Sequence, residues 1–87
     1  MATVFIPPLI RDLTNGQTRV IVPGSSVREV ITQLETRYPG ITGRLCQDGS
    51  IRPGMAVVVD SEVSTSGMRH RLSDASEVHF LPAISGG

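Results

Sequence analysis

The sequence predicts a compact α+β fold, in which one main helix packs across a mixed sheet of four to five strands. Three observations support this class. Short runs of apolar, mainly β-branched residues are bounded by proline, glycine or Asn-Gly pairs, as is typical of strands. One segment, residues 26–38, carries apolar residues at the spacing of one helical face. The chain of 87 residues has room for a single domain with a modest core.

The first two predicted strands are Thr3–Ile6 and Gln17–Val22. Pro7 and Pro8 end the first strand, because proline has no N–H to donate to a sheet. The Asn15-Gly16 pair between the two runs is a strong turn signal. The two strands therefore most simply form a hairpin whose loop is longer than a two-residue turn.

The main helix is predicted between Ser26 and the Pro39-Gly40 pair. Its apolar face consists of Val27, Val30, Ile31, Leu34 and Tyr38. Glu29 stands three residues after Ser26, which is the spacing of a capping box. In that arrangement the serine hydroxyl accepts a free backbone N–H, and the glutamate accepts the N–H of the cap residue.

The second half of the chain is less regular. Residues 41–53 are predicted to form a loop or a short helical turn, with a bend at 48–50. Met55–Val59 is apolar on both faces and is therefore expected inside the sheet, followed by a turn and a short edge strand at 62–64. After an irregular segment, the last strand is predicted at Glu77–Leu81 and ends at Pro82.

The end of the sequence is its most informative part. We expect residues 1–82 to form the domain and residues 83–87 to form a flexible tail ending in Gly86-Gly87. A loose terminus without a role is the simplest alternative. However, the segment from Pro82 to the end can extend roughly 20 Å at about 3.4 Å per residue, enough to enter another protein's active site. Glycine lacks a Cβ and can pass through a narrow channel.

Composition excludes several classes of function. Eight acidic and eight basic residues balance, which argues against nucleic acid and anionic membranes as partners. No apolar stretch approaches the about 20 residues of a membrane helix, and no signal peptide is evident. The single cysteine, Cys46, fits a reducing cytoplasm and is expected to be a buried filler. No metal-binding motif and no phosphate-binding glycine loop is present.

Two motifs near the end of the chain resemble a known family. Residues 80–87, Phe-Leu-Pro-Ala-Ile-Ser-Gly-Gly, are similar to the ending of the MoaD/ThiS superfamily of ubiquitin-like sulfur carrier proteins. Residues 72–78, Leu-Ser-Asp-Ala-Ser-Glu-Val, resemble that family's L-x-D-G-D-x-V, although Ala75 and Ser76 depart from it. Within the superfamily the chain most resembles the CysO type, through the Val-Phe-Ile-Pro and Thr-Asn-Gly-Gln segments at 4–7 and 14–17.

The resemblance implies a β-grasp fold, in which the last strand lies parallel beside the first. It also implies that the carboxylate of Gly87 is the working group, adenylated and then converted to a thiocarboxylate that donates sulfur. The residues expected to contact partner enzymes are Pro82, Ala83, Ile84, Ser85 and Gly86. The chain itself is then a carrier and not an enzyme.

The partners implied are separate enzymes. An E1-like adenylyltransferase and sulfurtransferase of the MoeB/ThiF type would load Gly87 by using ATP. A PLP-dependent cysteine synthase would accept the sulfur, and a zinc metalloprotease of the JAMM type would release cysteine from the tail. ATP, PLP and zinc belong to these partners, and no cofactor is expected on this chain.

Three alternative functions stay open at this point. The chain could be a MoaD-like small subunit of molybdopterin synthase, a ThiS-like thiamine sulfur carrier, or a ubiquitin-like protein modifier attached through Gly87 to lysines of other proteins. The chain has no lysine of its own; its eight basic residues are all arginine. Codon usage would explain this absence of lysine. A second explanation is that the chain has no amine of its own that could attack an activated Gly87 carboxylate.

His79 is expected on the face of its strand opposite Val78 and Phe80, with Phe80 in the core.

Overall fold

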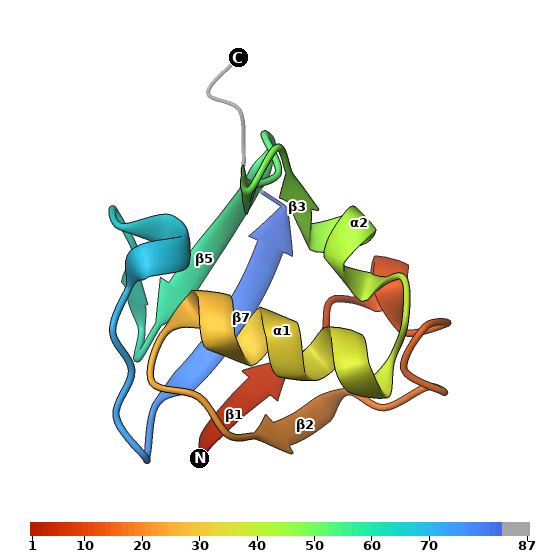
Figure 1. The fold of residues 1–87 in the computed structure, drawn as a ribbon, viewed down its shortest axis with the longest axis horizontal. Helices are drawn as coiled ribbons and strands as arrows, with labels where there is room; N and C mark the ends of the chain where they lie inside the picture. The colour runs from red at the N-terminus through yellow and green to blue at the C-terminus, as the bar shows by residue number, and fades with distance from the viewer. Residues whose placement is uncertain (83–87) are drawn as a thin grey trace.

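The computed structural model describes residues 1–82 of the chain. A five-stranded mixed sheet carries its main helix across one face (Figure 1). The strand order is β2-β1-β7-β5-β6, and β3 and β4 form a separate two-stranded hairpin. The strands are β1 (Ala2–Phe5), β2 (Arg19–Val22), β3 (Cys46–Gln47), β4 (Ser50–Ile51), β5 (Met55–Val59), β6 (Glu62–Val63) and β7 (Glu77–Pro82). The helices are α1 (Val27–Arg37) and α2 (Ile41–Leu45), with 3-10 turns η1 (Pro8–Ile10) and η2 (Gly67–Arg69).

The arrangement is the β-grasp fold that the resemblance implied. Strands β1 and β2 pair antiparallel, with Phe5 opposite Arg19, which confirms the predicted hairpin. Strand β7 then lies parallel to β1, with Phe5 opposite His79. The prediction that the first and last strands are parallel neighbours is therefore confirmed. No helix within residues 1–82 is long and apolar enough to cross a membrane.

Strand β5 lies between β7 and β6, as predicted for an interior strand. Only its alternate residues Val57 and Val59 are buried, however, since the other face of the sheet carries no helix. The prediction that Pro82 ends the last strand after Leu81 was wrong by one residue. Pro82 is itself the final residue of β7 and pairs with Met55. Proline is tolerated at a strand end, where its missing N–H interrupts no further ladder.

Helix α1 begins at the predicted cap residue. The Ser26 hydroxyl accepts the backbone N–H of Glu29 at 3.2 Å. The other half of the predicted capping box was wrong, because the Glu29 carboxylate accepts the N–H of Ser25 at 3.0 Å and not that of Ser26. The Ser25 hydroxyl donates to the same carboxylate, so the glutamate is held one residue further back. These hydrogen bonds to Ser25 lower the pKa of Glu29.

Residues 41–53 contain more structure than the sequence indicated. The short helical turn is α2, and the predicted bend at 48–50 is the tip of the β3–β4 hairpin. Asp48 and Gly49 both have positive φ, of 54° and 77°, as a type I′ turn requires. The hairpin was missed because its strands are only two residues long and show no alternation.

The core lies between the sheet and α1. Phe80 is its largest side chain and is almost completely buried, as predicted. The other buried apolar residues are Ala2, Val4, Ile6, Ile10, Val20, Val22, Val27, Val30, Ile31, Leu34, Ile41, Leu45, Cys46, Val57, Val59 and Val78. The alternation of Val4, Val78 and Phe80 with half-buried neighbours shows that one sheet face is covered and the other is open to solvent.

The turn before α1 requires a glycine. Gly24 has φ of 150°, and a Cβ there would lie 3.0 Å from both the backbone nitrogen and Cγ2 of Val30. We predict that Gly24→Ala lowers the free energy of unfolding by about 1–3 kcal/mol, through strain and overpacking. The matched control is Gly43→Ala in α2, where the added Cβ meets no atom within 4 Å. Urea denaturation should show Gly43→Ala as stable as the native chain or slightly more so; equal loss in both variants would contradict the account.

Candidate functional site at the end of the last strand

The predicted site begins where β7 ends. Pro82 is the last described residue and lies at the end of the interior strand β7, paired with Met55. The other predicted site residues, Ala83, Ile84, Ser85, Gly86 and Gly87, lie outside the described residues. The structure therefore defines the base of the predicted tail and the surfaces that surround it.

The two strands that pair with β7, β1 and β5, bring other segments of the chain close to Pro82. Because β1 runs parallel to β7, the end of β1 and the following η1 turn lie at the same end of the sheet. Because β5 runs antiparallel to β7, its first residue, Met55, meets Pro82. The base of the tail is thus surrounded by segments from the first ten residues and from the middle of the chain.

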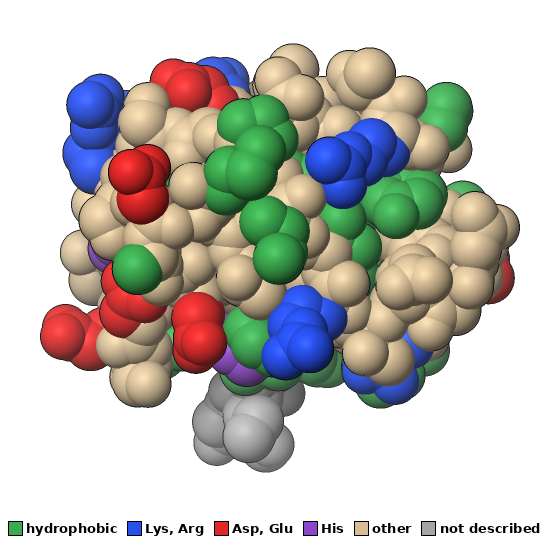
Figure 2. Space-filling model, turned by 90° about the horizontal axis from the view of Figure 1, so that it is seen from below, with side chains coloured by type: hydrophobic (Ala, Val, Ile, Leu, Met, Phe, Trp, Pro, Cys, Tyr) green, Lys and Arg blue, Asp and Glu red, His purple; other side chains and the backbone are tan. Residues whose placement is uncertain are grey.

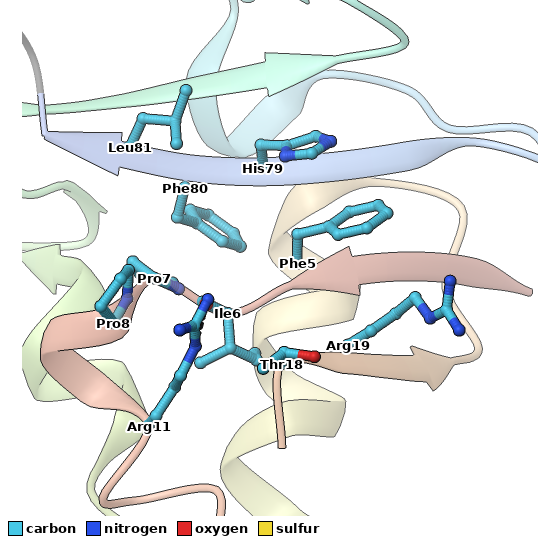
Figure 3. A pocket seen from close by; sticks show the side chains of 10 residues that line it. All are labelled: Phe5, Ile6, Pro7, Pro8, Arg11, Thr18, Arg19, His79, Phe80 and Leu81. Carbon is cyan, nitrogen blue, oxygen red and sulfur yellow. Dashed lines mark hydrogen bonds between the residues drawn. The ribbon is translucent and has the colours of Figure 1, made fainter. Parts of the chain in front are cut away.

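A hollow of about 280 Å³ lies on the open face of the sheet at this end (Figure 3). Its walls include Phe5, Arg11, Arg19, His79 and Leu81. The rings of Phe5 and His79 are stacked, with centroids 4.1 Å apart and planes 4° from parallel. His79 is thus half-buried on the face opposite Phe80, as predicted, and it rests on an aromatic ring. We call this hollow the sheet hollow.

A second hollow, of about 480 Å³, lies between η1, α2 and the start of β5. It is mostly apolar, with Leu9, Ile10 and Met55 in its walls, and we call it the helix hollow. Arg44 donates from Nη2 to the carbonyl of Leu9 at 2.8 Å. Arg52 donates from Nη2 to the carbonyl of Gly43 at 2.9 Å. Two arginines therefore border each hollow.

The corner between α1 and α2 is fixed by one carboxylate. Glu35 accepts the backbone N–H groups of Gly40 at 2.9 Å and Thr42 at 2.8 Å. Hydrogen bonds from Gly40 and then Thr42 stabilise the charged form and lower the pKa of Glu35. The carboxylate thereby satisfies N–H groups at the start of α2 and sets the position of the helix hollow.

The other sequence candidates lie away from the base of the tail or carry no obvious chemistry. Cys46 is buried, as expected, and burial raises the pKa of its thiol, which disfavours the reactive thiolate. His70 shares a 2.7 Å hydrogen bond with Ser64. Among residues 1–82, no three His, Cys, Asp or Glu side chains gather in a group that could hold a metal ion.

The comparisons with known proteins agree with this geometry. The family model described as the ThiS family matches residues 9–87. The chain belongs to the ThiS family. Sulfur carrier protein CysO of Mycobacterium tuberculosis is 37% identical over 92 residues, covering 98% of this chain and 97% of the relative. Small archaeal modifier protein 3 of Haloferax volcanii is 34% identical over 65 residues, covering 72% of this chain and 71% of the relative.

The solved structures extend this likeness to three dimensions. The Amycolatopsis orientalis BexX/CysO complex contains a chain that matches with a TM-score of 0.91 and 31% identity, and each chain is fully covered. The crystal structure of Mycobacterium tuberculosis CysO matches with a TM-score of 0.88 and 31% identity over 97% of this chain and all of that one. The ThiS-family assignment and the β-grasp fold therefore agree, and both structures carry the name CysO, the type that the sequence resembles.

Sequence reasoning missed most of the surface around the base of the tail. Phe5 was assigned to a strand but not paired with His79, because that contact depends on the register between the first and last strands. Arg44 and Arg52 lay in the segment whose structure the sequence left open. A usable signal was present in Pro7-Pro8, which ends β1 beside the end of β7 and forms part of the sheet hollow.

The pKa of Glu35 leads to a prediction about stability and pH. Its folded pKa lies below the usual value near 4.5, so the carboxylate stabilises the fold above that pH and loses its contribution as the pH falls through the folded value. We predict that Glu35→Gln unfolds at lower urea concentration than the native chain at pH 7. The gap should narrow at pH 3, and Glu62→Gln on the exposed edge strand should leave the pH 7 midpoint unchanged. An equal gap at both pH values would contradict the assigned role.

Proposed function

We propose that this chain is a sulfur carrier, whose Gly87 carboxylate is adenylated and converted to a thiocarboxylate, and that cysteine biosynthesis receives the sulfur. One observation carries the proposal: the 37% identity to a protein named sulfur carrier protein CysO extends over 98% of this chain. The family match also continues to residue 87, so the glycine pair falls inside it. The chain acts in this proposal as a co-substrate, and separate enzymes perform the chemistry.

The proposed chemistry has two steps at Gly87. In the first, a carboxylate oxygen attacks the α-phosphorus of ATP, the bond from that phosphorus to the pyrophosphate oxygen breaks, and an acyl-adenylate forms. In the second, a sulfur nucleophile adds to the activated carbonyl carbon, and AMP leaves with the bonding electrons. With hydrosulfide as the sulfur nucleophile, the S–H proton passes to solvent and Gly87 ends directly in a thiocarboxylate. A carboxylate that is not activated is a poor electrophile, so the adenylate is needed.

The fold supports the proposal through what it does at the base of the tail. Strand β7 lies between β1 and β5, and it pairs with β1 at 77–79 and with β5 at 78–82. The pairing with β5 therefore holds the strand up to Pro82. The sheet hollow and the helix hollow are open depressions on either side, and neither encloses a substrate. A firmly paired strand end with open surfaces on both sides suits a tail that is inserted into a partner enzyme. That partner would supply the ATP site, the PLP or the zinc.

The test is intact-mass spectrometry after incubation with an E1-like enzyme of the MoeB/ThiF type, ATP and a sulfur source. We predict a mass gain equal to the replacement of one oxygen by sulfur. The gain should disappear when ATP is omitted and when Gly87 is deleted. An unchanged mass, with an enzyme that loads another carrier in the same buffer, would overturn the proposal.

A second candidate function is attachment to other proteins. The likeness to Small archaeal modifier protein 3 over 72% of this chain favours it. Attachment would join Gly87 to lysine amines, and this chain contains no lysine that could compete. Lysine-linked adducts of the tagged chain in cells, lost on deletion of Gly87, would support the modifier. Thiocarboxylate without such adducts would support the carrier alone.

A further inference from the structure

The charges of this neutral chain are distributed unevenly along the sheet. Four arginines lie at the end of the sheet from which the predicted tail leaves, and we call this surface the arginine end. They are Arg11 and Arg19 at the sheet hollow and Arg44 and Arg52 at the helix hollow. Two carboxylates accompany them: Asp12 lies 3.7 Å from Arg44, and Asp48 is at the tip of the β3–β4 hairpin.

The opposite end of the sheet is acidic. Asp60 accepts the backbone N–H of Glu77 at 2.9 Å where β7 begins. Asp74 lies three residues earlier and 3.5 Å from the amino terminus, and Glu62 is on the neighbouring edge strand. Figure 2 views the molecule from below Figure 1, and so from the end at which β7 begins. Most acidic side chains in this view lie over the left half of the face, with arginines also at its upper left. The carboxylates are therefore more numerous at this end, although the amino terminus and Arg71 also lie there, and the arginine end carries more cations than carboxylates.

Backbone carbonyls restrain three of the four arginines, and Arg44 also forms an exposed ion pair with Asp12, which water screens. Arg11, Arg44 and Arg52 each donate one hydrogen bond to a backbone carbonyl, at 2.8–3.0 Å. A guanidinium has five N–H donors, so the remaining ones can bind a carboxylate in the two-bond geometry that arginine favours. Because backbone contacts already restrict these side chains, binding orders them at a smaller entropic cost.

Apolar side chains separate the arginines. Leu9 and Leu81 are exposed to 76% and 44%, and each borders one of the two hollows. The Phe5–His79 stack forms the floor of the sheet hollow near Leu81 (Figure 3). Exposed leucines framed by cations have the composition of a protein interface, with an apolar centre and a charged rim.

We propose that the arginine end docks on the adenylating enzyme, on a surface that has carboxylates around the entrance to its tail channel and apolar side chains between them. This proposal rests on the proposed sulfur-carrier function. The charge polarity then turns the chain so that its tail approaches the channel first, while the acidic end is repelled. A symmetric second copy fits poorly, because a two-fold interface would place arginines against arginines.

The experiment measures pyrophosphate release by the E1-like enzyme as the concentration of the chain is varied. The test variant is Arg19→Glu with Arg52→Glu, which reverses one exposed arginine at each hollow. The control is Arg28→Glu with Arg69→Glu, which changes the net charge equally at exposed arginines away from the arginine end. We expect kcat/KM to fall by about 10-fold or more in the test variant, mainly through KM, and by less than about 2-fold in the control. Thermal unfolding of both variants shows that each is folded.

Salt provides a second readout. For the native chain kcat/KM should fall steeply as ionic strength rises, and for the test variant it should fall much less. Equal kinetics of the test and control variants, with the native chain active, would overturn the docking proposal and leave the carrier function standing. A defect confined to the later transfer of sulfur to an acceptor would also overturn it. Absence of pyrophosphate release with the native chain would instead count against the proposed function.

Discussion

The parallel pairing of β1 with β7 is the constraint on which the rest of the structure depends. It places the last strand in the interior of the sheet, where β5 completes its ladder on the other side. Its register sets Val4 beside Val78 in the core and Phe5 beside His79 on the open face. A shift by one residue would exchange these faces, burying the histidine and exposing Phe80. Core packing and the functional surface are therefore fixed by the same set of hydrogen bonds.

The pairing of β1 with β7 also determines which segments of the chain lie around Pro82. Parallel strands end at the same edge, so the Pro7-Pro8 corner and the exposed Leu9 lie near Pro82. The β-grasp topology then adds the α1–α2 corner, whose geometry depends on the Glu35 carboxylate. The result is a small protein that offers a partner a basic and apolar surface around the segment that the proposed chemistry uses, while its own hollows stay open.

Local signals in the sequence predicted most of the fold. Proline and glycine marked the ends of β1, β2 and α1, and helical spacing with Ser26 located the start of α1. Features that depend on contacts between distant segments could not be obtained in this way. The Phe5–His79 stack needs the strand register, and the hydrogen bond of Arg44 to Leu9 joins segments 35 residues apart. The choice of Ser25 over Ser26 by Glu29 depends on the backbone angles of the turn, which residue types alone do not specify.

The central claim is that the carboxylate of Gly87 is the group that is activated. The most direct measurement is ATP–pyrophosphate exchange by an E1-like enzyme, supplied either with the chain ending in a free acid or with a semisynthetic chain ending in a Gly87 amide. The amide keeps the fold and the length of the tail but has no carboxylate to attack ATP. The account predicts exchange that depends on the free-acid chain and none above background with the amide. Equal exchange with the two chains would contradict it.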